Sequence, residues 1–131
     1  MRIAVIGALL TLLVASCGGP ARVGGPLAAI LSTTGEGVRF RNPTARNVYY
    51  TAMERETAAL VDWAPCTDPA RCSSVPPRGE VTIPYAAIYG YEPGDREAIV
   101  FYWELVPTTP DGDFRVENLR SQVVSLAGAG R

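Results

Sequence analysis

A chain of 131 residues is long enough for one domain and too short for two of ordinary size. Hydrophobic residues make up 47% of it, and 12 basic residues nearly match 13 acidic ones, so we predict a globular protein that does not bind nucleic acid. Histidine and lysine are absent, which excludes serine triads, cysteine–histidine pairs and serine–lysine dyads. We therefore predict that the protein is not an enzyme.

The first residues have the pattern of a targeting segment. Arg2 supplies a positive charge, and the run from Ile3 to Ala15 that follows contains none. As a helix this run would be about 20 Å long, against about 30 Å for the hydrocarbon core of a membrane. The length favours a signal peptide over residues 1–16, rather than a transmembrane helix or an N-terminal core helix.

The end of this segment, Val14-Ala15-Ser16-Cys17, resembles the lipobox of bacterial lipoproteins. The resemblance implies that the Cys17 thiol receives a diacylglyceryl group, with acyl chains such as palmitate. It also implies that signal peptidase II cleaves before Cys17 and that the new amino terminus is acylated. Gly18 follows in place of a retaining aspartate, so we expect a lipoprotein of the cell envelope, at the outer membrane or the periplasmic face. An ordinary signal peptide is the alternative.

The mature chain divides into a Gly- and Pro-rich tether over residues 17–26 and a domain over 27–131. Short apolar runs separated by turn signals predict strands in that domain. The expected strands are Leu27–Thr33, Val38–Arg41, Val48–Glu54, Ala58–Trp63, Glu80–Ile83, Glu97–Val106 and, at the end, Gln122–Leu126. We expect a proline-rich loop over residues 64–77 and one helical turn within 84–91.

Seven or eight short strands without alternating helices predict an all-β fold, an antiparallel β-sandwich of about seven strands. In Val38–Arg41 the alternation points Val38 and Phe40 inward and both arginines outward. The stretch Ile99–Trp103 is apolar on both faces, which is typical of a central strand. The domain loosely resembles the immunoglobulin-like domains of secreted bacterial proteins, without a specific motif.

Two further cysteines, Cys66 and Cys72, lie six positions apart in the proline-rich loop. In an exported protein this arrangement predicts a structural disulfide. A tetrahedral zinc site would need more cysteine or histidine ligands than the mature chain offers, and the CxxC redox spacing is missing. We predict no metal and no cofactor, and free thiols are the alternative.

The remaining candidate site residues are exposed or aromatic. Arg71, near the tip of the 66–72 loop, gives that loop a superficial similarity to the reactive loops of serine-protease inhibitors. Tyr89 and Tyr91, beside Gly90, could form a recognition patch for a protein or a glycan, or could cap the end of the core.

Two pairs of carboxylates are candidates for chemistry. Glu54 with Glu56, or Asp111 with Asp113, would be the basis of an enzyme of unfamiliar type, and the second pair could contribute to a calcium site. Solvated acids at strand ends and turns are the simpler interpretation.

The best functional hypothesis is a membrane-anchored envelope lipoprotein that acts as a binding or structural accessory module. A lipid anchor would hold it at the membrane, and its partner would be an envelope protein or a glycan. The inhibitor and the unfamiliar enzyme are the alternatives, and the sequence predicts no oligomeric state.

Overall fold

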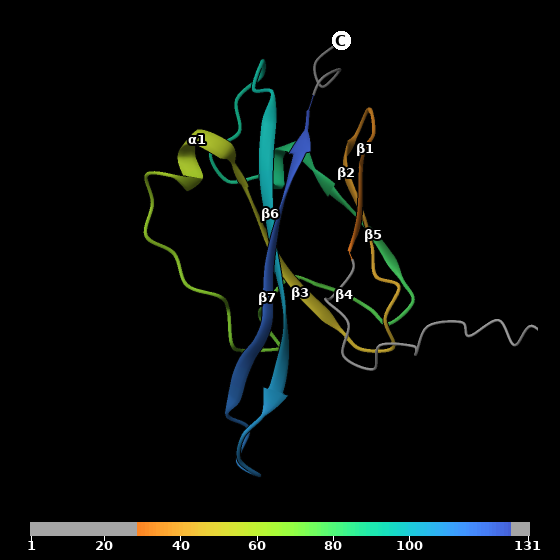
Figure 1. Ribbon diagram of the computed structural model, residues 1–131, viewed down its shortest axis with the longest axis vertical. Helices are drawn as coiled ribbons and strands as arrows, with labels where there is room; N and C mark the ends of the chain where they lie inside the picture. The colour runs from red at the N-terminus through yellow and green to blue at the C-terminus, as the bar shows by residue number, and fades with distance from the viewer. Residues whose placement is uncertain (1–28, 127–131) are drawn as a thin grey trace, which may run out of the picture.

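The computed structural model describes residues 29–126, which form seven strands in two antiparallel sheets and one short α-helix (Figure 1). Sheet A has the order β1-β2-β5, and sheet B has the order β4-β3-β6-β7. The elements are β1 (Ile30–Thr33), β2 (Gly37–Arg41), β3 (Val48–Glu54), α1 (Arg55–Ala58), β4 (Ser74–Val75), β5 (Glu80–Pro84), a 3-10 turn (Tyr85–Ala87), β6 (Glu97–Pro107) and β7 (Phe114–Ser125). The predicted signal peptide, Cys17 and the tether lie outside the described residues.

The hydrophobic core lies between the two sheets, to which both contribute buried side chains. Val38 and Phe40 of β2 are completely buried and the arginines beside them are exposed, which confirms the predicted alternation. The ring of Phe40 lies 5.6 Å from that of Tyr50 and 5.7 Å from that of Tyr102, both in sheet B. Edge and tilted ring contacts of this kind join the sheets across the core.

The longest apolar strand is a central one, as predicted. β6 pairs with β3 on one side and with β7 on the other. Its residues Ala98, Val100 and Tyr102 belong to the core, while Trp103 is buried as well, on the other face. A strand that is apolar on both faces therefore has cover on both.

The expected strand Ala58–Trp63 is wrong: the chain forms α1 at Arg55–Ala58 and then leaves the sheet. The carboxylate of Glu54, the last residue of β3, accepts hydrogen bonds from the backbone N–H of Glu56 and Thr57. These bonds satisfy two N–H groups that a helix leaves free at its start, so the helix begins where the strand ends. The apolar residues beyond it lie in a loop, where Leu60 is 85% exposed.

The largest differences from the expected strands are at β1, β4 and β7. β1 begins at Ile30, a short β4 forms at Ser74–Val75 within the predicted loop, and β7 begins at Phe114 instead of at residue 122. Val75 is completely buried against β3, which explains why the loop pairs there. A register shift opposite Trp103 interrupts the β6–β7 pairing, and the bulge hides the alternation of β7 in the sequence. The predicted helical turn is confirmed as the 3-10 turn at Tyr85–Ala87.

Candidate functional site

The second cysteine pair forms the predicted disulfide. Cys66 and Cys72 are bonded, with their Cα atoms 5.7 Å apart. The backbone oxygen of Cys66 accepts a hydrogen bond of 3.1 Å from the indole Nε1 of Trp103. The disulfide therefore closes a loop whose first residue is attached to the outer face of β6.

An aromatic cluster holds the chain between α1 and β4 against that outer face. The ring of Trp63 lies 4.3 Å from that of Phe101 and 6.2 Å from that of Trp103, and Trp103 is only 1% exposed. These contacts remove apolar surface of the central strand from water. The disulfide loop thus has a clear structural role as part of the cover of sheet B.

Arg71 is highly exposed, but its backbone forms a turn. Its side chain is 86% exposed, and its Nε lies 3.5 Å from a carboxylate oxygen of Asp68. The backbone N–H groups of Arg71 and Cys72 both donate to the carbonyl oxygen of Asp68, at 2.9 Å. A reactive loop must present extended backbone to a protease, so inhibition through Arg71 requires this turn to open.

The structure separates the two tyrosines of the predicted recognition patch. The ring of Tyr91 stacks on that of Tyr85 at 5.3 Å, and both pack against the core. Tyr89 is 62% exposed and bridges to Met53 of β3. Gly90 between them has a φ of +79°, a conformation that favours glycine and turns the chain between the inward and the outward ring.

Tyr85 is anchored as well as packed. Its hydroxyl donates a hydrogen bond of 2.5 Å to the carbonyl oxygen of Thr34, and burial together with the neighbouring Tyr91 raises the pKa of Tyr85. Of the three tyrosines in this segment, Tyr89 alone offers an open ring to a ligand. Its role as a binding residue stays a prediction.

The first candidate pair of carboxylates does not converge on a reaction site. Glu54 is buried, which acts to raise its pKa, but the hydrogen bonds from the backbone of Glu56, Thr57 and Arg55 outweigh burial and lower that pKa. Its carboxylate is therefore ionised and occupied as a helix cap. The side chain of Glu56 is exposed.

The second pair of carboxylates lies in the turn between β6 and β7, and both Asp111 and Asp113 are exposed. The carbonyl oxygen of Asp113 accepts a hydrogen bond from the backbone N–H of Thr108. Within residues 29–126 no group of three or more Cys, Asp and Glu side chains is arranged to hold a metal ion.

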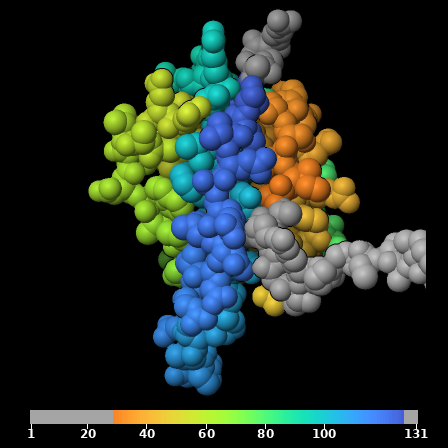
Figure 2. Space-filling view, viewed as in Figure 1, coloured from red at the N-terminus to blue at the C-terminus, as the bar shows by residue number. Residues whose placement is uncertain are grey.

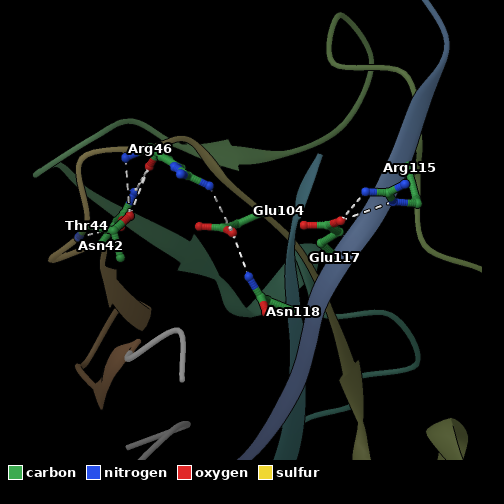
Figure 3. Close-up of polar contacts among 7 residues, drawn as sticks. All are labelled: Asn42, Thr44, Arg46, Glu104, Arg115, Glu117 and Asn118. Carbon is green, nitrogen blue, oxygen red and sulfur yellow. Dashed lines mark hydrogen bonds and ion pairs between the residues drawn. The ribbon is translucent and has the colours of Figure 1, made fainter. Parts of the chain in front are cut away.

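The sequence interpretation missed a polar cluster around Glu104, which Figure 3 shows. Glu104 is 8% exposed and accepts a hydrogen bond of 2.8 Å from Nδ2 of Asn118, which has a φ of +55°. Nη1 of Arg46, from the β2–β3 turn, lies 3.8 Å from the same carboxylate oxygen. The sequence does mark this position, because Glu104 is an acid inside the most apolar of the expected strands.

Asn42, completely buried, connects the turns beside this cluster (Figure 3). Its Nδ2 donates to the carbonyl oxygens of Arg46 at 2.6 Å and Val75 at 3.2 Å, and its Oδ1 accepts from the N–H of Thr44 at 2.9 Å. Every polar atom of this amide has a partner, as a buried amide requires. The arrangement fixes the turn that carries Arg46.

An open pocket of about 1130 Å³ lies at the opposite end of the domain, where α1, the start of β6 and the end of β7 meet. Arg55 and Glu97 form an ion pair in it, and the acid Glu54 is held as the helix cap. Its lining mixes acids and arginines, and the acidic side chains are exposed or already bonded. The lining residues are Glu54, Arg55, Glu56, Ala59, Gly94, Asp95, Arg96, Glu97, Ser125 and Leu126.

Comparison of the chain with models of protein families, with curated proteins and with solved structures finds no match. The single helix among residues 29–126 is one turn long, so none in this part of the chain is long and apolar enough to cross a membrane.

Proposed function

We propose that the protein is a membrane-anchored lipoprotein of the cell envelope whose domain acts as a binding or structural accessory module. The observation that carries the proposal is the motif Val14-Ala15-Ser16-Cys17 at the end of an uncharged run within the first twenty residues. The anchor is a lipid on Cys17, and two or three acyl chains hold a protein stably at a membrane surface.

The Cys66–Cys72 disulfide supports export from the cytoplasm. Disulfides form and persist in oxidising compartments such as the periplasm, whereas cytosolic thiols are kept reduced. The three cysteines then divide into one for the lipid and two for each other. We place the protein at the outer membrane or the periplasmic face.

The strand order supports an immunoglobulin-like β-sandwich as the fold of the domain. The order β1-β2-β5 against β4-β3-β6-β7 corresponds to the immunoglobulin order A-B-E against C′-C-F-G. This fold serves many unrelated functions, so it favours no particular ligand.

An accessory role fits the polar groups of residues 29–126 better than catalysis. The two buried carboxylates, Glu54 and Glu104, are both bonded within the domain. Tyr89 is the best candidate for contact with an envelope protein or a glycan. Pull-down from solubilised envelope should enrich one partner, and Tyr89→Ser should weaken it while Tyr49→Phe, at a buried ring, should not.

Mass spectrometry of the protein isolated from its own membrane tests the proposal. The expected mass is that of the chain from Cys17 onward with acyl groups on that residue, and reduction should add two hydrogens at Cys66 and Cys72. An unprocessed amino terminus, or a mature Cys17 without lipid, would overturn the proposal.

A further inference from the structure

Three arginines gather at the end of the domain where its first strand begins. Ile30, the first residue of β1, pairs with Arg41, the last residue of β2. Arg46 lies in the turn that follows β2, and Arg78 reaches this turn through a hydrogen bond of 2.8 Å from its Nη1 to the carbonyl oxygen of Pro43. Arg41, Arg46 and Arg78 are here called the tether-end arginines.

Two of these arginines present their guanidinium groups to solvent. Within residues 29–126, Arg41 and Arg78 are exposed and form no ion pair with an acid. Glu80 stands opposite Arg41 in the pairing of β2 with β5, but its carboxylate lies 3.1 Å from Arg39. Arg41 and Arg78 can therefore attract an anion without breaking an internal pair.

The third arginine, Arg46, lies beside an acidic side chain. Arg46 is 72% exposed and approaches Glu104, whose side chain is only 10% exposed. Removing Arg46 would leave that buried acid without its cation, so Arg46 belongs to the surface but is unsuitable as a test position.

The opposite end of the domain has the opposite charge. Among residues 29–126, this end carries six acids and two arginines, an excess of four negative charges. The turns before β2 and β6 lie at this end (Figure 1), and so do the residues that line the open pocket. The acids are Glu36, Glu54, Glu56, Glu92, Asp95 and Glu97, and the arginines are Arg55 and Arg96.

Glu80 and Glu104 lie beside the tether-end arginines, and further acids lie on the β6–β7 hairpin at this end of the domain. Figure 2 shows this hairpin as a narrow projection below the body of the domain, and its turn carries Asp111 and Asp113. The start of β1 lies to one side of the projection in Figure 1, with sheet A. A membrane that approaches this end of the domain from the side of sheet A therefore contacts the arginines before it contacts the two aspartates.

The length of the chain before the domain limits how far this end can be from a lipid on Cys17. Cys17 and Ala29 are twelve positions apart, with eleven residues between them. Even a fully extended chain of that length reaches only about 40 Å. The stretch contains Arg22 and no acid, so it does not oppose the charge of the arginines.

We infer that the tether-end arginines dock the domain on anionic phospholipid headgroups of the membrane that holds its lipid anchor. The inference rests on the proposed function, because the lipid on Cys17 supplies the proximity. Docking turns the acidic end and its pocket away from the membrane, since like charges repel. The pocket end and Tyr89 then stay accessible to a partner.

Hydrogen exchange of the acylated protein in vesicles tests the inference. The protein, purified in detergent from its own membrane, is reconstituted into vesicles of phosphatidylcholine alone or with phosphatidylglycerol. The backbone amides of Asn42, residues 44–47, Arg78 and Gly79 should gain protection only with phosphatidylglycerol, and high salt should remove it. Equal exchange in the two kinds of vesicle would overturn the inference.

Charge variants separate docking from a change in the fold. Each arginine at an anionic surface is worth about a fivefold change in binding, so Arg41→Gln with Arg78→Gln should lower the ratio of docked to free domain about 25-fold. Arg41→Lys with Arg78→Lys should keep the protection. The matched control is Arg55→Gln with Arg96→Gln, which removes the same charge at the acidic end and should leave protection unchanged. Equal loss in the control or in the lysine variant would contradict the inference.

The same samples distinguish failure of this inference from failure of the proposed function. A mass without acyl groups refutes the lipid anchor, and sedimentation of that unacylated protein with the two kinds of vesicle then decides on the arginines. Salt-sensitive sedimentation with phosphatidylglycerol that the glutamine variant loses would support them. Sedimentation that does not depend on phosphatidylglycerol would refute them.

Discussion

Glu54 shows how one side chain can end a strand and begin a helix. Glu54→Ala should lower the free energy of unfolding at pH 7 by about 1 kcal/mol, because two backbone N–H groups lose their acceptor. Urea titration measures the change. Glu56→Ala is the matched control, since that side chain is exposed, and an equal loss in both variants would contradict the role of Glu54 as the cap.

The cap should also depend on pH. The folded protein lowers the pKa of Glu54 below its ordinary value of 4.5, so the stabilisation is present above that value and is lost as the pH falls through the lower pKa of the folded state. The difference in unfolding free energy between the parent protein and Glu54→Ala should therefore shrink in this acidic range. A difference that stays constant from neutral to strongly acidic pH would exclude an ionised cap.

Asn118 combines two tasks that a pair of variants can separate. Its φ of +55° is adopted readily by glycine and at a cost by alanine, and its Nδ2 bonds to Glu104. Asn118→Gly should lose the hydrogen bond only, whereas Asn118→Ala should lose about 1 kcal/mol more through backbone strain. Thermal unfolding of the two variants measures this difference. Equal stability of both would show that the backbone relaxes at the bulge.

At the scale of elements, the loop between α1 and β4 depends on the disulfide and the aromatic cluster together. Replacing Cys66 and Cys72 by alanine should lower the free energy of unfolding by about 2 kcal/mol, because the unfolded chain gains freedom. The fluorescence of Trp63 and Trp103 should change too, since the cysteine loop is attached to Trp103. Asp68→Ala, in the same loop, is the control: it removes the ion pair with Arg71 and should leave the fluorescence nearly unchanged.

The strands that were predicted correctly from the sequence are those in which each face is either at least partly buried along its length or exposed along its length. Val38 and Phe40 alternate with arginines, and β6 is apolar on both faces, so simple periodicity identifies both strands. Residues 58–63 show no alternation: four apolar residues in a row precede Asp62, and Trp63 packs on β6 from outside the sheet. The start of β7 was missed because the bulge at Asn118 changes which face each residue meets.

Among the candidate sites, too, the local features were predicted and the contacts between distant segments were not. The spacing of Cys66 and Cys72 predicted their bond, because a disulfide needs only local proximity and an oxidising compartment. The separation of Tyr89 from Tyr91 depends on the backbone at Gly90 and could not be read from composition. The Glu104 cluster brings together three distant segments, and sequence alone offered only the odd acid in an apolar strand.

At the scale of the whole molecule, Phe40 packs against aromatic rings of the opposite sheet and so stabilises the contact between the two sheets. It is completely buried, and its ring meets Tyr50 and Tyr102 of sheet B. Phe40→Ala should lower the free energy of unfolding by about 3–5 kcal/mol, because a cavity is left where the sheets meet. A domain of this size has about 5–15 kcal/mol in total, so the variant should unfold at a much lower temperature.

The matched control for Phe40 is Phe101→Ala, at the ring that lies on the outer face of sheet B under Trp63. Phe101 is only partly buried, so its loss should cost less and should act on the loop before the core. Calorimetry should show a single transition for Phe40→Ala at a much reduced temperature, and Phe101→Ala should change tryptophan fluorescence with a smaller shift. If the two variants lost equal stability, the outer aromatic cluster would be as important to the fold as the core between the sheets.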